Sequence, residues 1–258
     1  MKGTQRKTWQ TLFMVLPAIM LCVLFCKTDV MAATKNHTMK AGTTYNIKNA
    51  DYSTTVYHKI TVNSPGFITL TGWEKYPTSS SKNGMYIRLY NSKKMALEGK
   101  NVSALVKNGN YTGYYAVKKG TYYVQTKACK NYRLKYTFTK VTDKSGNSKA
   151  KALGIKRNTK YKGLLLAGES GKTADWYKFT LSKEQYISLA VGVKANNSIR
   201  FQIYPGNSAN AFTNGYAYGA RGNTKMAGRL KAGTYYVKVS RQGNKKGTNG
   251  YYYLNLVY

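Results

Sequence analysis

The sequence predicts an all-β protein built from two tandem antiparallel β-sandwiches. The first observation is a repeat: Lys119-Gly-Thr-Tyr-Tyr-Val-Gln-Thr126 returns 113 residues later as Ala232-Gly-Thr-Tyr-Tyr-Val-Lys-Val239. The second is that apolar and polar residues alternate over many short stretches, which is typical of strands with one buried face. The third is that no stretch longer than two turns has a helical period. The long spacing of the repeat indicates a duplicated domain rather than a solenoid of short units.

Residues 1–33 have the pattern of a secretory signal peptide. Basic residues precede an apolar run from Leu12 to Phe25, and Val30-Met-Ala-Ala33 offers small residues for cleavage. The run is interrupted by Pro17 and is shorter than the roughly 20 residues that a bilayer-spanning helix needs. We therefore expect cleavage, export and a mature chain without a transmembrane segment. A retained membrane anchor is the alternative.

The two halves of the mature chain follow one order of strands. Residues 34–140 form the first module, residues 141–150 a short linker without large apolar residues apart from Val141, and residues 151–258 the second module. Turns rich in Gly and Asn separate the stretches that alternate. The main expected strands are Thr43–Ile47, His58–Val62, Phe67–Thr71, Met85–Tyr90 and Tyr132–Phe138, then Tyr177–Leu181, Tyr186–Leu189, Ile199–Tyr204 and Tyr252–Leu256.

The order of motifs resembles the bacterial pre-peptidase C-terminal domain. The resemblance is carried by Asp175-Trp-Tyr-Lys-Phe179, by Ala232–Val239 and by the closing Tyr252–Leu256. The first module is more diverged, because Val56 stands where the counterpart of Asp175 is expected. The resemblance implies a jelly-roll-like sandwich from a bacterium, similar to the collagen-binding modules of clostridial collagenases, which binds substrate or matrix and does not cut.

The charge balance predicts anionic partners. The chain has 42 Lys and Arg residues against 8 Asp and Glu residues. Loss of residues 1–33 removes four basic residues and one acidic residue, which leaves 38 and 7 and a formal charge of +31. A charge of this size produces long-range attraction to polyanions and opposes self-association, so we expect a monomer.

Catalytic and metal-binding residues are scarce. The two histidines are His37, which lies in the first mature residues where disorder is common, and His58, which takes the position matched by Tyr177 and is expected to be structural. Glu169 and Asp175 do not make the acidic cluster through which some relatives of the resembled family bind calcium. Cys129 is the only mature cysteine, which excludes a disulfide framework. We expect no enzyme, no cofactor and no metal.

Outward-facing aromatic and basic residues are the expected binding groups. Tyr235, Phe179 and Tyr252 should point into the core, so their strand neighbours point outward. Outward aromatic rings offer rigid contact area, although packing against a neighbouring strand or module is the alternative. Trp73 is expected in a loop. The candidate ligand-binding residues are Tyr123, Trp176, Lys178, Tyr236, Lys238, Lys245, Lys246, Tyr251 and Tyr253.

The function that these observations predict is binding outside the cell. We expect a secreted, non-enzymatic protein that captures an anionic polysaccharide, a wall polymer or extracellular matrix protein and is retained electrostatically at the cell surface. Alternatives are a glycan-specific lectin, a structural matrix protein and a membrane-active cationic protein. Interleaved Lys and Tyr residues also suit single-stranded nucleic acid, but export argues against nucleic acid as a physiological partner.

Overall fold

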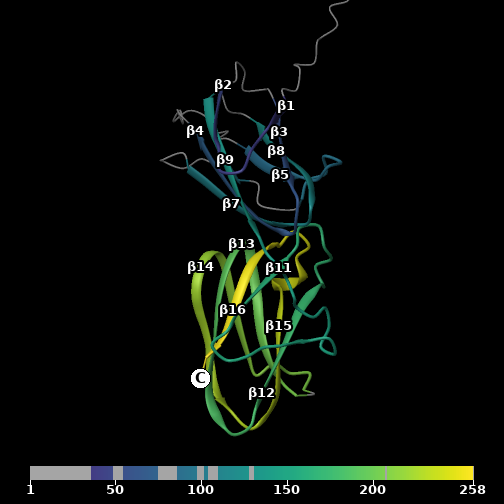
Figure 1. Cartoon of the computed structure of the whole chain (residues 1–258), viewed down its shortest axis with the longest axis vertical. Helices are drawn as coiled ribbons and strands as arrows, with labels where there is room; N and C mark the ends of the chain where they lie inside the picture. The colour runs from purple at the N-terminus through teal and green to yellow at the C-terminus, as the bar shows by residue number, and fades with distance from the viewer. Residues whose placement is uncertain are drawn as a thin grey trace, which may run out of the picture. The chain divides into compact units, whose positions relative to one another are not determined.

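The computed structural model describes residues 36–48, 55–74, 86–97, 102–103, 110–127, 131–206 and 208–257 (Figure 1). These residues form strands and one short 3₁₀ helix, which confirms the all-β prediction. Within them, no helix is long and apolar enough to cross a membrane. The predicted signal peptide, residues 1–33, and Cys129 lie outside the described residues.

The strands fall into an N-terminal group, β1–β9, and a C-terminal group, β10–β16, with the 3₁₀ helix at Gln242–Asn244. Their bounds are β1 (Asn36–Thr38), β2 (Thr44–Lys48), β3 (Val56–Val62), β4 (Gly66–Glu74), β5 (Tyr86–Tyr90), β6 (Val102–Ser103), β7 (Asn110–Val117), β8 (Gly120–Lys127), β9 (Asn131–Lys140), β10 (Leu153–Gly154), β11 (Lys160–Leu165), β12 (Ala174–Leu181), β13 (Gln185–Pro205), β14 (Thr213–Leu230), β15 (Gly233–Arg241) and β16 (Gly250–Val257).

The N-terminal group consists of two sheets that enclose a common core. Their strand orders are β1-β3-β8-β5-β6 and β2-β9-β4-β7. Val56, Ile60 and Val62 alternate inward along β3, as the sequence pattern predicts. His58 of one sheet is hydrogen-bonded to Tyr132 of the other, so the two layers face each other. Every pair in these sheets is antiparallel except β1 with β3.

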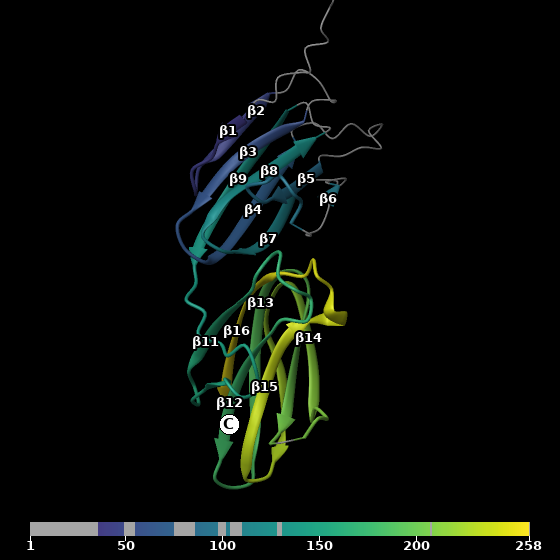
Figure 2. The same cartoon turned by 90° about the vertical axis from the view of Figure 1, so that its right-hand side faces the viewer.

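The C-terminal group is one continuous sheet that folds over on itself. Its order is β10-β12-β15-β13-β16-β11, with β14 beside β13 (Figures 1 and 2). The rings of Tyr177 on β12 and Tyr252 on β16 are 6.4 Å apart, whereas three strand spacings in a flat sheet are about 14 Å. Residues 199–205 of β13 pair with β15 and residues 188–195 pair with β16. A single strand therefore belongs to both layers of this sandwich.

Both groups have the same strand order once β13 and β14 are each counted as two consecutive strands. The orders β10-β12-β15-β13-β14 and β11-β16-β13-β14 then correspond to the two sheets of the N-terminal group. The short parallel edge pair is also repeated, as β1 with β3 and β10 with β12. The sequence predicted separate strands at Tyr186–Leu189 and Ile199–Tyr204, and this prediction is wrong because β13 runs through both.

The repeated Gly-Thr-Tyr-Tyr motif closes the same turn twice. Gly233 has a φ of +145°, a conformation that residues with a Cβ rarely adopt. Two residues later the Tyr235 hydroxyl donates a hydrogen bond of 3.0 Å to the carbonyl of Lys231. Tyr122 does the same to Lys118 at 2.9 Å. The first tyrosine of the motif therefore fastens the turn that begins the strand.

Two further sequence expectations fail. Trp73, expected in a loop, lies within β4. His37, expected in a disordered end, lies in β1 with its ring stacked 5.5 Å from the ring of His58. The segment expected to be a linker, residues 141–150, is hydrogen-bonded to the C-terminal group. Gly146 exchanges backbone hydrogen bonds with Trp176, and Asp143 accepts one from the Leu164 amide at 2.7 Å.

Candidate functional site

Four of the predicted binding residues come together on the outer surface of the C-terminal group. Strand pairing places Trp176 beside Lys238 and Lys178 beside Tyr236, and it adds Tyr204 on the other side of Tyr236. The side chains of the residues between them point inward, since Tyr177, Val237 and Ile203 are fully buried. We call Trp176, Lys178, Tyr204, Tyr236 and Lys238 the C-terminal aromatic face.

The rings and ammonium groups of this face contact one another. The Trp176 and Tyr204 rings are 5.9 Å apart, and the Lys238 Nζ lies 5.4 Å from the Trp176 ring centroid. Lys149, from the segment before β10, places its Nζ 4.8 Å from the Tyr236 ring centroid. Such contacts at exposed sites are worth about 0.5–1 kcal/mol. The lysines can therefore turn toward an incoming anion at small cost.

The carboxylate nearest to this face along β12 belongs to Asp175 and points the other way. Asp175 is buried and accepts a hydrogen bond of 2.6 Å from the Tyr252 hydroxyl in the core. Among the described residues that form the face there is no acidic side chain. The face consequently presents three aromatic rings and two lysines, and none of its five residues is acidic.

The remaining predicted site residues lie elsewhere. Tyr123 is on the outer surface of the N-terminal group. Tyr251 stacks on Phe67 at 4.8 Å, so its ring is occupied by packing, as the alternative interpretation held. Tyr253 lies 3.8 Å beneath the Nζ of Lys160. Lys245 and Lys246 are exposed in the turn after the 3₁₀ helix, beyond the end of β15 and outside the C-terminal aromatic face.

Tyr123 lies within a second aromatic cluster, formed with Tyr57 and Tyr90. The Tyr57 ring is 5.9 Å from the Tyr90 ring and 6.4 Å from the Tyr123 ring. The Gln125 amide donates to the Tyr57 hydroxyl at 2.9 Å and accepts from the Tyr90 hydroxyl at 2.8 Å. The Lys94 Nζ lies 4.7 Å and 5.7 Å from the Tyr57 and Tyr123 ring centroids. We call these five residues the N-terminal aromatic face.

The sequence reasoning missed several of these residues. Tyr57, Tyr90 and Tyr204 obey the same alternation that identified Tyr236, and counting outward positions along β3, β5 and β13 finds them. Lys94 and Lys149 lie in segments between strands, where no periodic pattern indicates which ring they approach.

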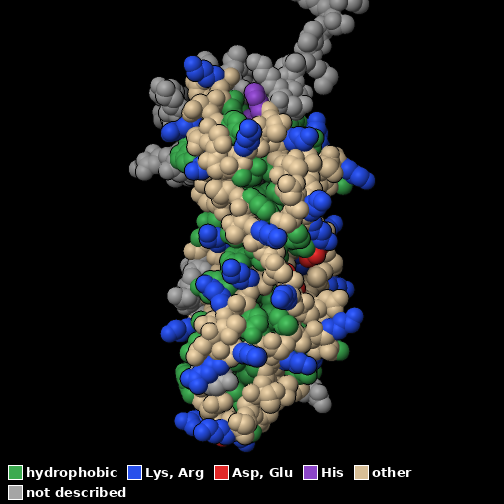
Figure 3. Space-filling model, in the orientation of Figure 1, with side chains coloured by type: hydrophobic (Ala, Val, Ile, Leu, Met, Phe, Trp, Pro, Cys, Tyr) green, Lys and Arg blue, Asp and Glu red, His purple; other side chains and the backbone are tan. Residues whose placement is uncertain are grey.

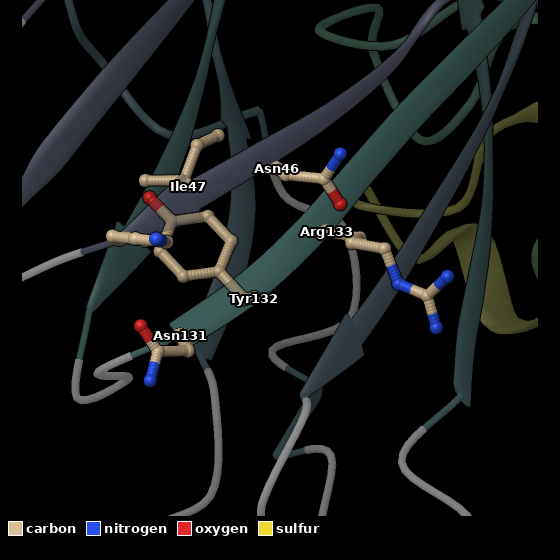
Figure 4. A pocket seen from close by; sticks show the side chains of 6 residues that line it. Asn46, Ile47, Asn131, Tyr132 and Arg133 are labelled. Carbon is tan, nitrogen blue, oxygen red and sulfur yellow. The ribbon is translucent and has the colours of Figure 1, made fainter.

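A cavity of about 460 Å³ opens beside β2 and β9 (Figure 4). It is lined by Asn46, Ile47, Lys48, Asn131, Tyr132 and Arg133. Figure 4 shows the side chains of Asn46 and Arg133 on one side of the strand pair and those of Ile47 and Tyr132 on the other, as alternation along a strand requires. A small-molecule site needs polar groups that converge on one point, and the side chains that line this cavity do not converge.

No catalytic arrangement emerges around the titratable groups that the structure describes. Within this part of the chain no three His, Cys, Asp or Glu side chains are placed to hold a metal ion. His58 is fully buried, and its Nε2 is hydrogen-bonded to the Tyr132 hydroxyl at 3.0 Å and to the Thr126 hydroxyl at 3.3 Å. Burial, and secondarily the charge of His37, lowers the pKa of His58 to about 3. His58 is a neutral structural residue, as expected.

The buried His58 should make the protein sensitive to acid. The unfolded chain has the ordinary histidine pKa of 6.5 and binds a proton more readily than the folded one between pH 6.5 and pH 3. Stability is fully present above pH 6.5 and falls as the pH drops, by about 2 kcal/mol between pH 6.5 and pH 4.5 from this group. Urea unfolding of His58→Gln at both pH values should show that this loss is absent. Equal losses in variant and parent would contradict the assignment.

Comparison with known proteins gives likenesses of fold. No family model matches the chain, and no curated protein does. Similar solved structures include the pre-peptidase C-terminal domain of collagenase from Bacillus anthracis, 23% identical over 40% of this chain and 92% of that one, with a TM-score of 0.34. The tandem CBM22-1–CBM22-2 domain of Paenibacillus barcinonensis Xyn10C is 9% identical over 77% and 82%, with a TM-score of 0.26. The CUB1-EGF-CUB2 domains of rat MASP-1 are 8% identical over 87% and 100%, with a TM-score of 0.27. Similarity of this extent carries no information about ligand or activity.

Proposed function

We propose that this chain is an exported, non-enzymatic binding protein that captures anionic polymers outside the cell, such as wall polymers and sulfated glycans. The observation that carries the proposal is the C-terminal aromatic face, where Trp176, Tyr204 and Tyr236 lie among Lys149, Lys178 and Lys238. Basic groups attract the polymer, and rings supply short-range contact.

The long-range part of the attraction comes from the whole chain. Its formal charge is +34, or +31 after loss of residues 1–33. Figure 3 shows Lys and Arg side chains spread over the whole visible surface of the described residues, with very few acidic ones among them. Such a surface raises the local concentration of a polyanion and its association rate. This attraction is sensitive to salt and does not distinguish one polyanion from another.

The short-range contacts that the aromatic rings can make support a second candidate function, that of a glycan-binding lectin. An aromatic ring has a negative face, against which the partially positive C–H groups of a sugar ring can pack. Contacts of this kind persist when salt screens the charges. We further propose that the two groups of strands are tandem modules of the pre-peptidase C-terminal type, because the same strand order and the same turn motif occur twice.

Binding to wall polymer and to a sulfated glycan across a salt series tests the proposal. The Debye length falls from about 10 Å at 0.1 M salt to about 3 Å at 1 M. We expect tight binding at low salt, with K178A/K238A weakened about tenfold and K156A/K183A weakened less than about threefold. The control pair removes the same two charges at exposed positions outside the face. Equal losses of affinity in both double variants would mean that the face contributes only its charge, like any other basic part of the surface. No binding at low salt would refute the proposed function.

A further inference from the structure

The two aromatic faces have the same strand register. Within the N-terminal face Tyr57 is paired with Gln125 and Tyr123 with Tyr90, while Lys59 lies beside Tyr123. Within the C-terminal face the pairs are Trp176 with Lys238, Tyr236 with Tyr204, and Lys178 with Tyr236. Three aromatic residues and one lysine thus occupy equivalent outward positions on equivalent strands.

We infer that each aromatic face is a binding site for the same class of ligand, a linear anionic polysaccharide, so that the chain has two sites. The inference rests on the proposed function and extends it from one face to two. It names sugar rings as the groups that the aromatic residues contact and anionic substituents as the groups that the lysines bind.

Folding alone does not account for the retained rings. The two groups of strands have diverged even at buried positions, where Val56 corresponds to Asp175 and Thr126 to Val239. Buried positions are more constrained by packing than outward ones. Aromatic residues nevertheless occupy the same three outward positions in both faces, which indicates a requirement at the surface.

The cations above the rings give an independent argument. Lys94 reaches Tyr57 and Tyr123 from the turn after β5. Lys149 reaches Tyr236 from the segment before β10. These lysines come from different places in the strand order, so a simple duplication does not explain why both faces have one. Each face has acquired an ammonium group within 5 Å of a ring, which complements an anion attached to a stacked sugar.

The orientation of the rings favours a saccharide over single-stranded nucleic acid. Tyr57 is inclined by 80° to Tyr90 and by 89° to Tyr123, and Trp176 by 39° to Tyr204. Successive bases stack on open, separate ring faces, whereas one flat base on Tyr57 would meet the edges of its neighbours. Sugar rings are rotated about each glycosidic bond and can present differently directed C–H faces.

Calorimetric titration of the mature chain with a defined sulfated hexasaccharide at 0.15 M salt tests the inference. A short ligand reports on each face separately. We expect two equivalents per chain, one equivalent for Trp176→Ala, one for Tyr57→Ala/Tyr123→Ala, and a loss of more than about tenfold in affinity when all three are combined. Trp73→Ala is the matched control, because Trp73 contacts Arg133 at 5.5 Å outside both faces and should leave two equivalents. Unchanged circular dichroism and melting temperature exclude misfolding.

The outcomes separate the two proposals. If the parent chain binds one equivalent of hexasaccharide and Trp176→Ala alone abolishes this binding, the second site is refuted and the proposed function stays intact. Inorganic polyphosphate that binds as tightly as the hexasaccharide and ignores the ring substitutions would overturn the saccharide assignment. Single-stranded oligonucleotide that binds more tightly and depends on Trp176 would replace the saccharide with nucleic acid. No binding of any polyanion would refute the proposed function itself.

Discussion

Replacing Arg241 by methionine should lower the free energy of unfolding by about 3–5 kcal/mol. Arg241 is 1% exposed. Its guanidinium donates to the carbonyl oxygens of Thr248 at 2.7 Å, Leu166 at 2.8 Å and Thr173 at 3.2 Å, and it pairs with Glu169 at 3.3 Å. Methionine fills part of the volume but leaves these acceptors without donors, and each buried unsatisfied group costs about 1–3 kcal/mol.

Urea unfolding followed by tryptophan fluorescence measures this loss. The matched control is Arg229→Met, because the Arg229 side chain is 71% exposed and lies 3.8 Å from Glu184. An exposed pair of this kind contributes about 0–1 kcal/mol. We expect a clearly lower urea midpoint for the Arg241 variant and a nearly unchanged one for the Arg229 variant. Similar midpoints for both would show that the buried guanidinium does not hold the surrounding loops.

Replacing Asp175 by asparagine should remove a loss of stability that the parent protein suffers as the pH rises from 4 to 7. Burial, with the nearby charge of Asp143, raises the pKa of Asp175 from 3.8 to about 7. The folded chain therefore binds a proton more readily than the unfolded chain between these pH values. The stabilisation is complete below pH 4 and is lost as the pH rises through 7, by roughly 4 kcal/mol in all.

Asparagine keeps an oxygen that can accept from Tyr252 and does not ionise. The difference in unfolding free energy between Asp175→Asn and the parent should shift by about 3 kcal/mol in favour of the variant between pH 5 and pH 7.5. Urea titrations at both pH values provide the numbers. Because His58 is present in both proteins, its opposite pH dependence cancels in this difference. Parallel curves would mean that Asp175 has an ordinary pKa in the folded chain.

Alternation along a strand predicted the inner and outer residues well. On β15 the residues expected inside, Tyr235, Val237 and Val239, are buried, and Tyr236 and Lys238 face outward as expected. The same alternation places Ser240 on the outward side as well, and it is buried. The strand ends at Arg241, whose guanidinium is hydrogen-bonded to the backbone of three neighbouring segments at this end of the strand. The alternation of apolar and polar residues describes a regular strand. It does not predict which other segments cover the end of that strand.

Contacts between distant segments could not be predicted in this way. The approach of Lys149 to Tyr236 and the stacking of Phe67 on Tyr251 depend on where turns and segments lie after folding. The continuity of β13 was missed for a related reason. Ala195-Asn-Asn-Ser198 has the composition of a turn, yet it forms an irregular step within a strand. Two Asn residues are compatible with a turn and with an irregular step in a strand. Only the pairing of the flanking residues with other strands distinguishes the two.

The shared strands β13 and β14 affect how the C-terminal sandwich comes apart. In a sandwich whose layers have separate strands, one layer can loosen while the other keeps its ladder. Here a residue pulled out of register against β15 transmits that displacement along the same backbone to the pairing with β16, and only the irregular step at residues 195–199 can absorb part of it. The two layers thus form one cooperative unit, in which local opening of one sheet is coupled to opening of the other.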